Sequence, residues 1–282
     1  MERVRRVVLD VDTGIDDALA ILYAVASPDL ELCGVTAVVG NVPAEVAARN
    51  SAAVLACAGA GAVPVAVGAT RTLAGDGPRA GPTNHGPDGL GGVRLPAGAD
   101  PSDDTPASVL RAAAARGPVT LVGLAPFANV ARLAHTSTDL VLVGGELATD
   151  GPPELNAELN AGHDPAATAR VLASSRPTTL YVADVFERVS VAADDVDRLR
   201  SSDRPAARLA GELLAVRRDH LVGDAGALVL LTHRGLFRVE PRRMALADGH
   251  LTATGAGRLL DVVVDVDAPA VAAAYVETLL SS

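Results

Sequence analysis

Residues 7–18 read VVLDVDTGIDDA, and this stretch decides the fold. An apolar run, expected to form a strand over Val4–Leu9, leads into acidic residues and a glycine. A helix is expected over Asp16–Ala26, because apolar residues there recur at helical spacing. A strand that turns sharply into a helix is the first half of a βαβ unit.

The same alternation continues outward to the C-terminus. Continuous Val and Leu runs are typical of strands buried on both faces, and their alternation with helices predicts a mostly parallel central sheet flanked by helices. In such a sheet the ligand site lies beyond the carboxyl ends of the strands. We therefore expect one α/β domain over residues 1–282. Further strands are expected at 30–39, 63–67, 119–124, 140–143, 178–182 and 259–266, and helices at 43–58, 105–116, 164–173, within 194–231 and at 269–280.

A long segment from about Gly68 to Pro106 is rich in Gly and Pro and carries no clear periodicity. Irregular connections of this length are uncommon inside compact domains unless they serve a function. We expect this segment to be a functional loop.

Composition narrows the class of protein. The formal net charge is −10, which disfavours binding to nucleic acid because phosphates are repelled. All 24 basic residues are Arg, so mechanisms that need a lysine are excluded. Cys33 and Cys57 are too few for a disulfide framework. No signal-peptide or membrane-spanning pattern is present, so we expect a cytoplasmic protein without a membrane partner.

An acidic cluster follows the first expected strand. Helix capping accounts for one or two aspartates there, but the cluster holds four within eight residues. Two carboxylates at about 4 Å repel by roughly 4 kcal/mol at an effective dielectric constant near 20. A cation would offset this cost, and oxygen ligands favour Ca²⁺ or Mg²⁺ over zinc. The four are Asp10, Asp12, Asp16 and Asp17.

One competing interpretation concerns Asp10 and Asp12. Their Asp-x-Asp spacing after a strand resembles the first motif of haloacid-dehalogenase-type phosphatases, Asp-x-Asp-x-Thr, whose first Asp is a nucleophile. That family also uses a downstream Lys (sometimes Arg). The chain has no Lys, and the Asp16-Asp17 pair does not belong to that pattern, so we disfavour this interpretation.

The sequence resembles the inosine-uridine nucleoside hydrolases over nearly its whole length. Residues 10–17 are similar to the N-terminal signature of that family, with Thr13 where members usually have Pro. Further similar elements follow in the same order: VVGN at 38–41, HGPDGLGG at 85–92, LAPFAN at 124–129, GG at 144–145, AELN and DP at 157–160 and 164–165, and GDAGA at 223–227.

The resemblance implies a nucleoside-hydrolase-like fold and Ca²⁺-dependent cleavage of a ribonucleoside into free base and ribose. Asp12 matches the general base, which takes a proton from a water held by the metal. The positions that match calcium ligands are Asp12, Asp17, the Leu124 carbonyl and Asp224. Those that match residues holding the ribose hydroxyls are Asp16, Asn41, Glu158 and Asn160, and Asp10 matches a supporting position. We expect Glu158 and Asn160, two apart in an irregular or strand-like segment, to point at one ligand.

The chain also departs from the family pattern. Gly223 stands where many members have a His that helps to protonate a leaving purine, and Pro152 stands where many have a sugar-binding Asn. His85 and His220 are candidate substitutes for that acid. The other histidines are expected at the surface or at helix ends. Few rings could touch a base, and most are expected in the core: Phe127, Tyr181, Phe186 and Phe237.

These departures leave two alternatives to hydrolysis of a common nucleoside. One is a specialised hydrolase of a modified nucleoside or another ribosyl compound. The other is a catalytically silent ribosyl-binding protein, against which the retained Asp12 argues. The family commonly forms homodimers or homotetramers, and the sequence does not decide between them.

Overall fold

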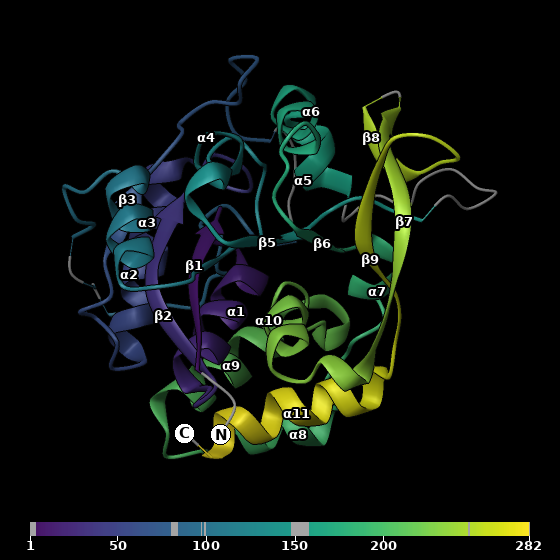
Figure 1. Cartoon of the computed structure of the whole chain (residues 1–282). Coiled ribbons are helices and arrows are strands. Elements are labelled where there is room, and N and C mark those ends of the chain that lie inside the picture. The colour runs from purple at the N-terminus through teal and green to yellow at the C-terminus, as the bar shows by residue number, and fades with distance from the viewer. Residues whose placement is uncertain are drawn as a thin grey trace.

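The computed structural model describes residues 4–79, 84–96, 98, 100–147, 158–247 and 249–281, without the side chains of residues 158 and 159. In this part of the chain, nine strands form a single sheet in the order β3-β2-β1-β4-β5-β6-β9-β7-β8 (Figure 1). The strands are β1 (Arg5–Val11), β2 (Leu30–Ala37), β3 (Val65–Val67), β4 (Thr120–Gly123), β5 (Asp139–Val143), β6 (Thr178–Tyr181), β7 (Phe237–Ala247), β8 (His250–Ala253) and β9 (Arg258–Val266).

Seven of these strands are parallel, from β3 through β6 to β9, which confirms the expected α/β class. The central strands are buried on both faces, as their continuous apolar runs predict: residues 7–11 of β1 are buried throughout. The helices are α1 (Ile15–Ala26), α2 (Ala44–Cys57), α3 (Pro106–Ala115), α4 (Val130–Leu133), α5 (Glu158–His163), α6 (Pro165–Leu172), α7 (Ala183–Phe186), α8 (Ala193–Arg200), α9 (Pro205–Val216), α10 (Ala225–Thr232) and α11 (Ala268–Ser281).

The helices form two groups around the sheet. Helix α1 contacts α2, α9, α10 and α11, while α3 packs on β1 and β2 and contacts α4, which in turn contacts α6 (Figure 1). The rings of Tyr23 in α1 and Tyr275 in α11 stack with centroids 5.7 Å apart. The predicted rings Phe127, Tyr181, Phe186 and Phe237 are all buried, as expected.

The strand order fixes where a ligand can bind. The chain runs from β1 outward through β2 to β3 and then returns to β4, which pairs with the other side of β1. A crevice forms where the order reverses in this way, beyond the carboxyl ends of the strands. Asp10 and Asp12 lie at that end of β1, and Leu124 directly follows β4.

Two features differ from the sequence expectation. The antiparallel hairpin of β7 and β8 was not predicted, and Pro241 lies inside β7. Among the described residues, strand β8 pairs with residues 244–247 of β7, whereas Pro241 pairs with β9 on its other side. Pro241 therefore lies where one side of β7 is an unpaired edge. Proline is tolerated at such an edge, because no neighbouring strand needs the N–H that it lacks. Residues 158–163 are helical, so the expectation of an irregular or strand-like segment at Glu158 and Asn160 was wrong.

No helix in the described part of the chain is long and apolar enough to cross a membrane. Cys33 and Cys57 are unpaired and half-buried, which agrees with two isolated thiols. The cytoplasmic location and the oligomeric state stay predictions.

Candidate active site

Asp10 joins three segments at the floor of the site. Its Oδ1 accepts hydrogen bonds from Thr36 Oγ1 in β2 (2.5 Å) and from Asn129 Nδ2 (2.8 Å), which precedes α4. Its other oxygen, Oδ2, is buried and has no hydrogen-bond partner among the described residues. Burial, with a smaller contribution from Asp12, raises the pKa of Asp10 to about 7, although the two hydrogen bonds oppose the shift. Asp10 therefore connects the carboxyl end of β1 to β2 and to the segment before α4.

Asp12 is buried against the loop that follows β2. Its Oδ2 accepts the backbone N–H of Asn41 at 2.6 Å, and its Oδ1 accepts Asn41 Nδ2 at 3.3 Å. A Cβ on Gly40 would lie 1.8 Å from Asp12 Oδ2, so only glycine lets the backbone approach this closely. Burial raises the pKa of Asp12, more than the nearby Arg79 guanidinium lowers it. The structure thus brings together Asp12 and Asn41, as the sequence predicts.

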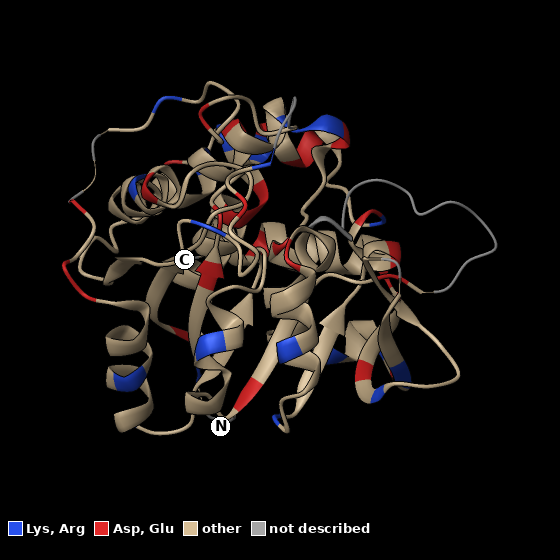
Figure 2. Cartoon of the chain, turned by 90° about the horizontal axis from the view of Figure 1, so that it is seen from above, with Lys and Arg blue, Asp and Glu red and all other residues tan. Residues whose placement is uncertain are grey.

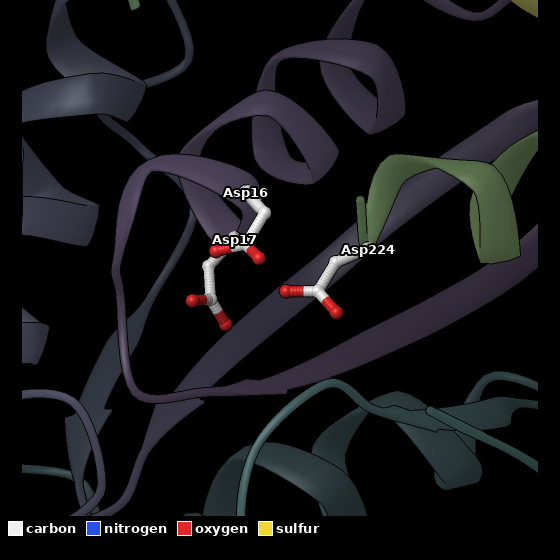
Figure 3. Close-up of side chains that lie close together, drawn as sticks. All are labelled: Asp16, Asp17 and Asp224. Atoms are coloured by element: carbon white, nitrogen blue, oxygen red, sulfur yellow. The ribbon is translucent and has the colours of Figure 1, made fainter. Parts of the chain in front are cut away.

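Three further carboxylates converge beside Asp12. Asp16 and Asp17 lie in the first turn of α1, and Asp224 lies at the start of α10 (Figure 3). One oxygen from each lies within 4.8 Å of the others, and all three side chains are buried. Asp17 is held in place because its Oδ2 accepts the N–H of Gly14 at 2.9 Å and its Oδ1 accepts the N–H of Asp12 at 3.3 Å. Viewed from above, some acidic segments lie near the middle of the molecule, and others are spread around its edge (Figure 2).

These carboxylates repel one another strongly. Burial and the neighbouring Asp12 and Asp16 raise the pKa of Asp17 well above its ordinary value. The pKa of Asp224 is raised in the same way, by burial first and then by Asp16, Asp17 and Asp12. Asp16 Oδ1 is buried with no hydrogen-bond partner among the described residues. An orphaned carboxylate oxygen among other carboxylates is what a cation site requires, so these residues fit a metal ion.

Asp16 also has two cationic or basic neighbours. Its Oδ2 forms a buried ion pair with Arg217 Nη2 at 3.0 Å, and its Oδ1 lies 3.6 Å from His85 Nδ1. Burial opposes ionisation, but Arg217 and His85 outweigh it and hold the pKa of Asp16 below its ordinary value. The N–H of Ile15 donates to His85 Nδ1 at 3.1 Å, which places the proton of the neutral ring on Nε2. Burial lowers the pKa of His85 and favours that neutral form.

A second arginine approaches from the loop after β3. Arg79 Nη1 donates to Asn41 Oδ1 at 3.1 Å, and its Nη2 donates to Asn160 Oδ1 at 2.9 Å. Asn160 Nδ2 in turn donates to the carbonyl oxygen of Leu124 at 2.8 Å. This carbonyl therefore already has one partner, and the oxygen offers a second lone pair.

The charges of this cluster suit a divalent ion. When all are ionised, the four carboxylates exceed the two guanidinium groups by two negative charges, which a divalent cation balances. The groups counted are Asp12, Asp16, Asp17, Asp224, Arg79 and Arg217. The donor atoms of the close triad are all carboxylate oxygens, which favours Ca²⁺ or Mg²⁺.

The sequence missed two residues of this region. Arg79 and Arg217 carry no local signal, because each reaches partners that are distant in the sequence. His163 ends α5, as expected of a helix-end histidine, and burial followed by the charge of Arg79 lowers its pKa. The side chain of Glu158 and the predicted departure at Pro152 lie outside the described residues.

The chain is similar to known proteins along most of its length. The model of the family described as inosine-uridine preferring nucleoside hydrolase matches residues 7–273. Uridine nucleosidase 1 from Arabidopsis thaliana is 30% identical over 238 residues, which cover 81% of this chain and 71% of that protein. The pyrimidine-specific ribonucleoside hydrolase RihA from Photobacterium profundum is 34% identical over 219 residues, covering 74% of this chain and 70% of that protein. The solved plant nucleoside hydrolase PpNRh1 shares the fold, with a TM-score of 0.86 at 23% identity over 99% of this chain and 100% of that one.

Proposed function

Because this chain belongs to the family of inosine-uridine preferring nucleoside hydrolases, we propose that it hydrolyses the N-glycosidic bond of a pyrimidine ribonucleoside, with Ca²⁺ bound by its acidic cluster. The products are the free base and ribose. The observation that carries the proposal is the buried group of Asp16, Asp17 and Asp224 at the point where the strand order reverses.

The ligand set proposed for the cation is Asp12, Asp17, Asp224 and the Leu124 carbonyl. Asp16, whose Oδ1 is orphaned, borders the same space and is proposed to hold a ribose hydroxyl. A divalent cation in this position would orient a water molecule and lower its pKa. This assignment accounts for the burial of several carboxylates that otherwise destabilise one another.

The reaction replaces the bond from the anomeric carbon to the base nitrogen by a bond to the water oxygen. The electron pair of the broken bond leaves with the base, and the sugar passes through an oxocarbenium-like transition state. Asp12 is proposed as the general base that accepts the proton of the attacking water. Its Oδ2 is oriented by the N–H of Asn41, and the surrounding carboxylates favour the positive charge that develops on the sugar.

The sugar is proposed to bind between the carboxylates and the side-chain amides. Asp16, Asn41, Glu158 and Asn160 are the proposed contacts to the ribose hydroxyls. Asp10 is proposed to act indirectly, because its hydrogen bonds fix the carboxyl end of β1 on which Asp12 lies.

The preference for a pyrimidine rests on two observations. Gly223 provides no side chain to protonate a purine, whereas a departing uracil spreads its charge over two carbonyl oxygens and needs less assistance. Two relatives are named for uridine or pyrimidine nucleosides. His85, with its Nε2–H form favoured by the Ile15 contact, is the proposed donor toward the base.

Release of reducing sugar from uridine, cytidine, inosine and adenosine, with and without EDTA, tests the proposal. We expect uridine or cytidine to be the best substrate, with turnover lost in EDTA and restored by Ca²⁺. Faster turnover of inosine would contradict the pyrimidine preference. Calcium binding without turnover of any of the four would instead favour a modified ribosyl substrate or a silent binding protein.

A further inference from the structure

Arg79 connects parts of the site that are distant in the sequence. The backbone N–H of Arg79 donates to the carbonyl oxygen of Gly40 at 3.0 Å, and this bond connects the loop after β3 to the loop after β2. Its guanidinium then spans two amides, donating to Asn41 Oδ1 at 3.1 Å and to Asn160 Oδ1 at 2.9 Å. Asn41 follows β2, whereas Asn160 belongs to α5, so a single side chain links two elements across the site.

These contacts fix the orientation of both amides. A guanidinium only donates hydrogen bonds, whereas a side-chain amide has an accepting oxygen on one side and a donating NH₂ group on the other. With its oxygen held by Arg79, Asn41 must direct its Nδ2 toward Asp12 Oδ1, at 3.3 Å. Asn160 must likewise direct its Nδ2 toward the Leu124 carbonyl at 2.8 Å.

By its contact with Arg79, each amide is oriented so that its NH₂ group donates to a group proposed to bind the cation. Asp12 is the proposed base and ligand, and the Leu124 carbonyl is a proposed ligand. We propose that Arg79 is a positioning residue of the hydrolase site, which acts through Asn41 and Asn160 to hold Asp12 and the Leu124 carbonyl in place. This inference rests on the proposed function, because it assigns a purpose to those two groups.

The geometry specifically needs arginine. The planar guanidinium presents donors in a rigid fork, so Nη1 and Nη2 can reach two separate oxygens at once. A lysine keeps the positive charge but presents one nitrogen on a flexible stem and cannot span the two amides in the same way. The effect of charge can thus be separated from the effect of bridging.

The experiment compares R79K and R79A with the wild-type protein and with R71A. Arg71 is a matched control, since it is an exposed arginine of the same loop and its Nη1 donates to the carbonyl of Gly75. Calcium affinity is measured by titration calorimetry without substrate, and kcat and KM are measured with uridine. Thermal unfolding confirms that each variant is folded.

We expect R79K and R79A alike to weaken calcium binding by about 10–100-fold, as removal of groups that orient metal ligands typically does. R71A should match the wild type. Calcium affinity of R79A within about two-fold of wild type would overturn the inference. So would an R79K protein that behaves like the wild type, because charge alone would then suffice.

Two double-variant cycles identify the route. If Arg79 acts through Asn41 and Asn160, R79A should lower calcium affinity and raise KM by less in the N41A and N160A backgrounds than in the wild type. Fully additive effects in both cycles would show that Arg79 acts independently of the two amides and would contradict the positioning role. A wild-type protein that neither binds calcium nor cleaves nucleosides would refute the proposed function itself, which distinguishes the two failures.

Discussion

At the scale of single residues, the largest loss of activity is expected from a change at Asp12. D12N keeps the size of the side chain but removes the base, so kcat for uridine should fall by about 10²–10⁴-fold. Sugar release under saturating substrate measures this change. D203N is the control, since Asp203 is exposed, and it should retain full activity. Normal turnover by D12N would exclude Asp12 as the base.

Gly223 cannot simply be replaced by a side chain that could protonate a base. Its φ is +60°, and a Cβ there would lie 2.6 Å from Asp16 Cβ and 3.1 Å from Phe186 Cζ. We expect G223H not to improve inosine cleavage. We also expect G223A to lower the free energy of unfolding by more than the about 1–2 kcal/mol that a left-handed conformation costs by itself.

The control variant G59A separates the cost of the left-handed backbone conformation from the cost of the steric clash with Asp16 that G223A introduces. Gly59 has a φ of +73°, and a Cβ there would have no heavy atom of the described residues within 4 Å, so only the backbone term applies. Urea denaturation of both variants gives the comparison. Equal destabilisation of G223A and G59A would contradict the steric explanation.

Residue spacing predicted the approach of the N-terminal aspartates but not the arginine that pairs with one of them. The aspartates at 10, 12, 16 and 17 are neighbours in sequence, so their approach follows from a strand, a turn and a helix. Arg217 meets Asp16 across 201 positions, a contact that no local pattern encodes. The close triad includes Asp16, which the sequence assigned to the sugar, together with the predicted ligands Asp17 and Asp224.

At the scale of elements, an aromatic stack is part of the packing of α11 on α1. Tyr275 is fully buried against Tyr23, and its hydroxyl donates only a long bond, 3.4 Å, to the Leu19 carbonyl. Y275A should therefore lower the free energy of unfolding by about 3–5 kcal/mol, as truncation of a buried ring does.

Y275F tests whether packing or the hydroxyl is responsible. It keeps the ring, so it should remain within about 1 kcal/mol of the wild type. Urea denaturation measures both variants. A loss in Y275F as large as that in Y275A would show that the hydroxyl, rather than the stacked ring, holds α11.

Elements with a strong hydrophobic signal were predicted well. The helices α1 and α2 and the strands from β1 to β6 lie within a few residues of their expected bounds, because their apolar residues form continuous runs in the strands and recur at helical spacing in the helices. The β7–β8 hairpin was missed because β7 is largely exposed and shows no clean alternation. The Gly68–Pro106 segment was expected to be functional, which stays a prediction; Arg79 within it donates hydrogen bonds to Asn41 and Asn160, two of the predicted site residues.

At the scale of the whole molecule, topology determines the charge of the site. The reversal of strand order brings the end of β1 next to the end of β4, while α1 and α10 direct three carboxylates to the same place (Figure 3). The resulting cluster is a cost to folding unless a cation or protons neutralise it. Stability and calcium binding should therefore depend on pH together.

The sign of this dependence follows from the raised pKa values. Burial raises the pKa of Asp10 from 3.8 to about 7, and those of Asp17 and Asp224 shift in the same direction. The folded protein then binds more protons than the unfolded chain between pH 4 and 7. In EDTA, its free energy of unfolding should fall as the pH rises through this range.

Calcium should reverse this trend, because it binds the ionised carboxylates of the folded protein and should stabilise that state more at pH 7 than at pH 4.5. At a free concentration 100 times its dissociation constant, the gain is about 2.7 kcal/mol. Urea denaturation between pH 4.5 and 8, with EDTA or calcium, measures both effects. D10N should flatten the part of the EDTA curve that approaches pH 7. A stability that rises with pH in EDTA would mean that these carboxylates are already neutralised by the chain's own arginines, and that no cation is needed to hold the site together.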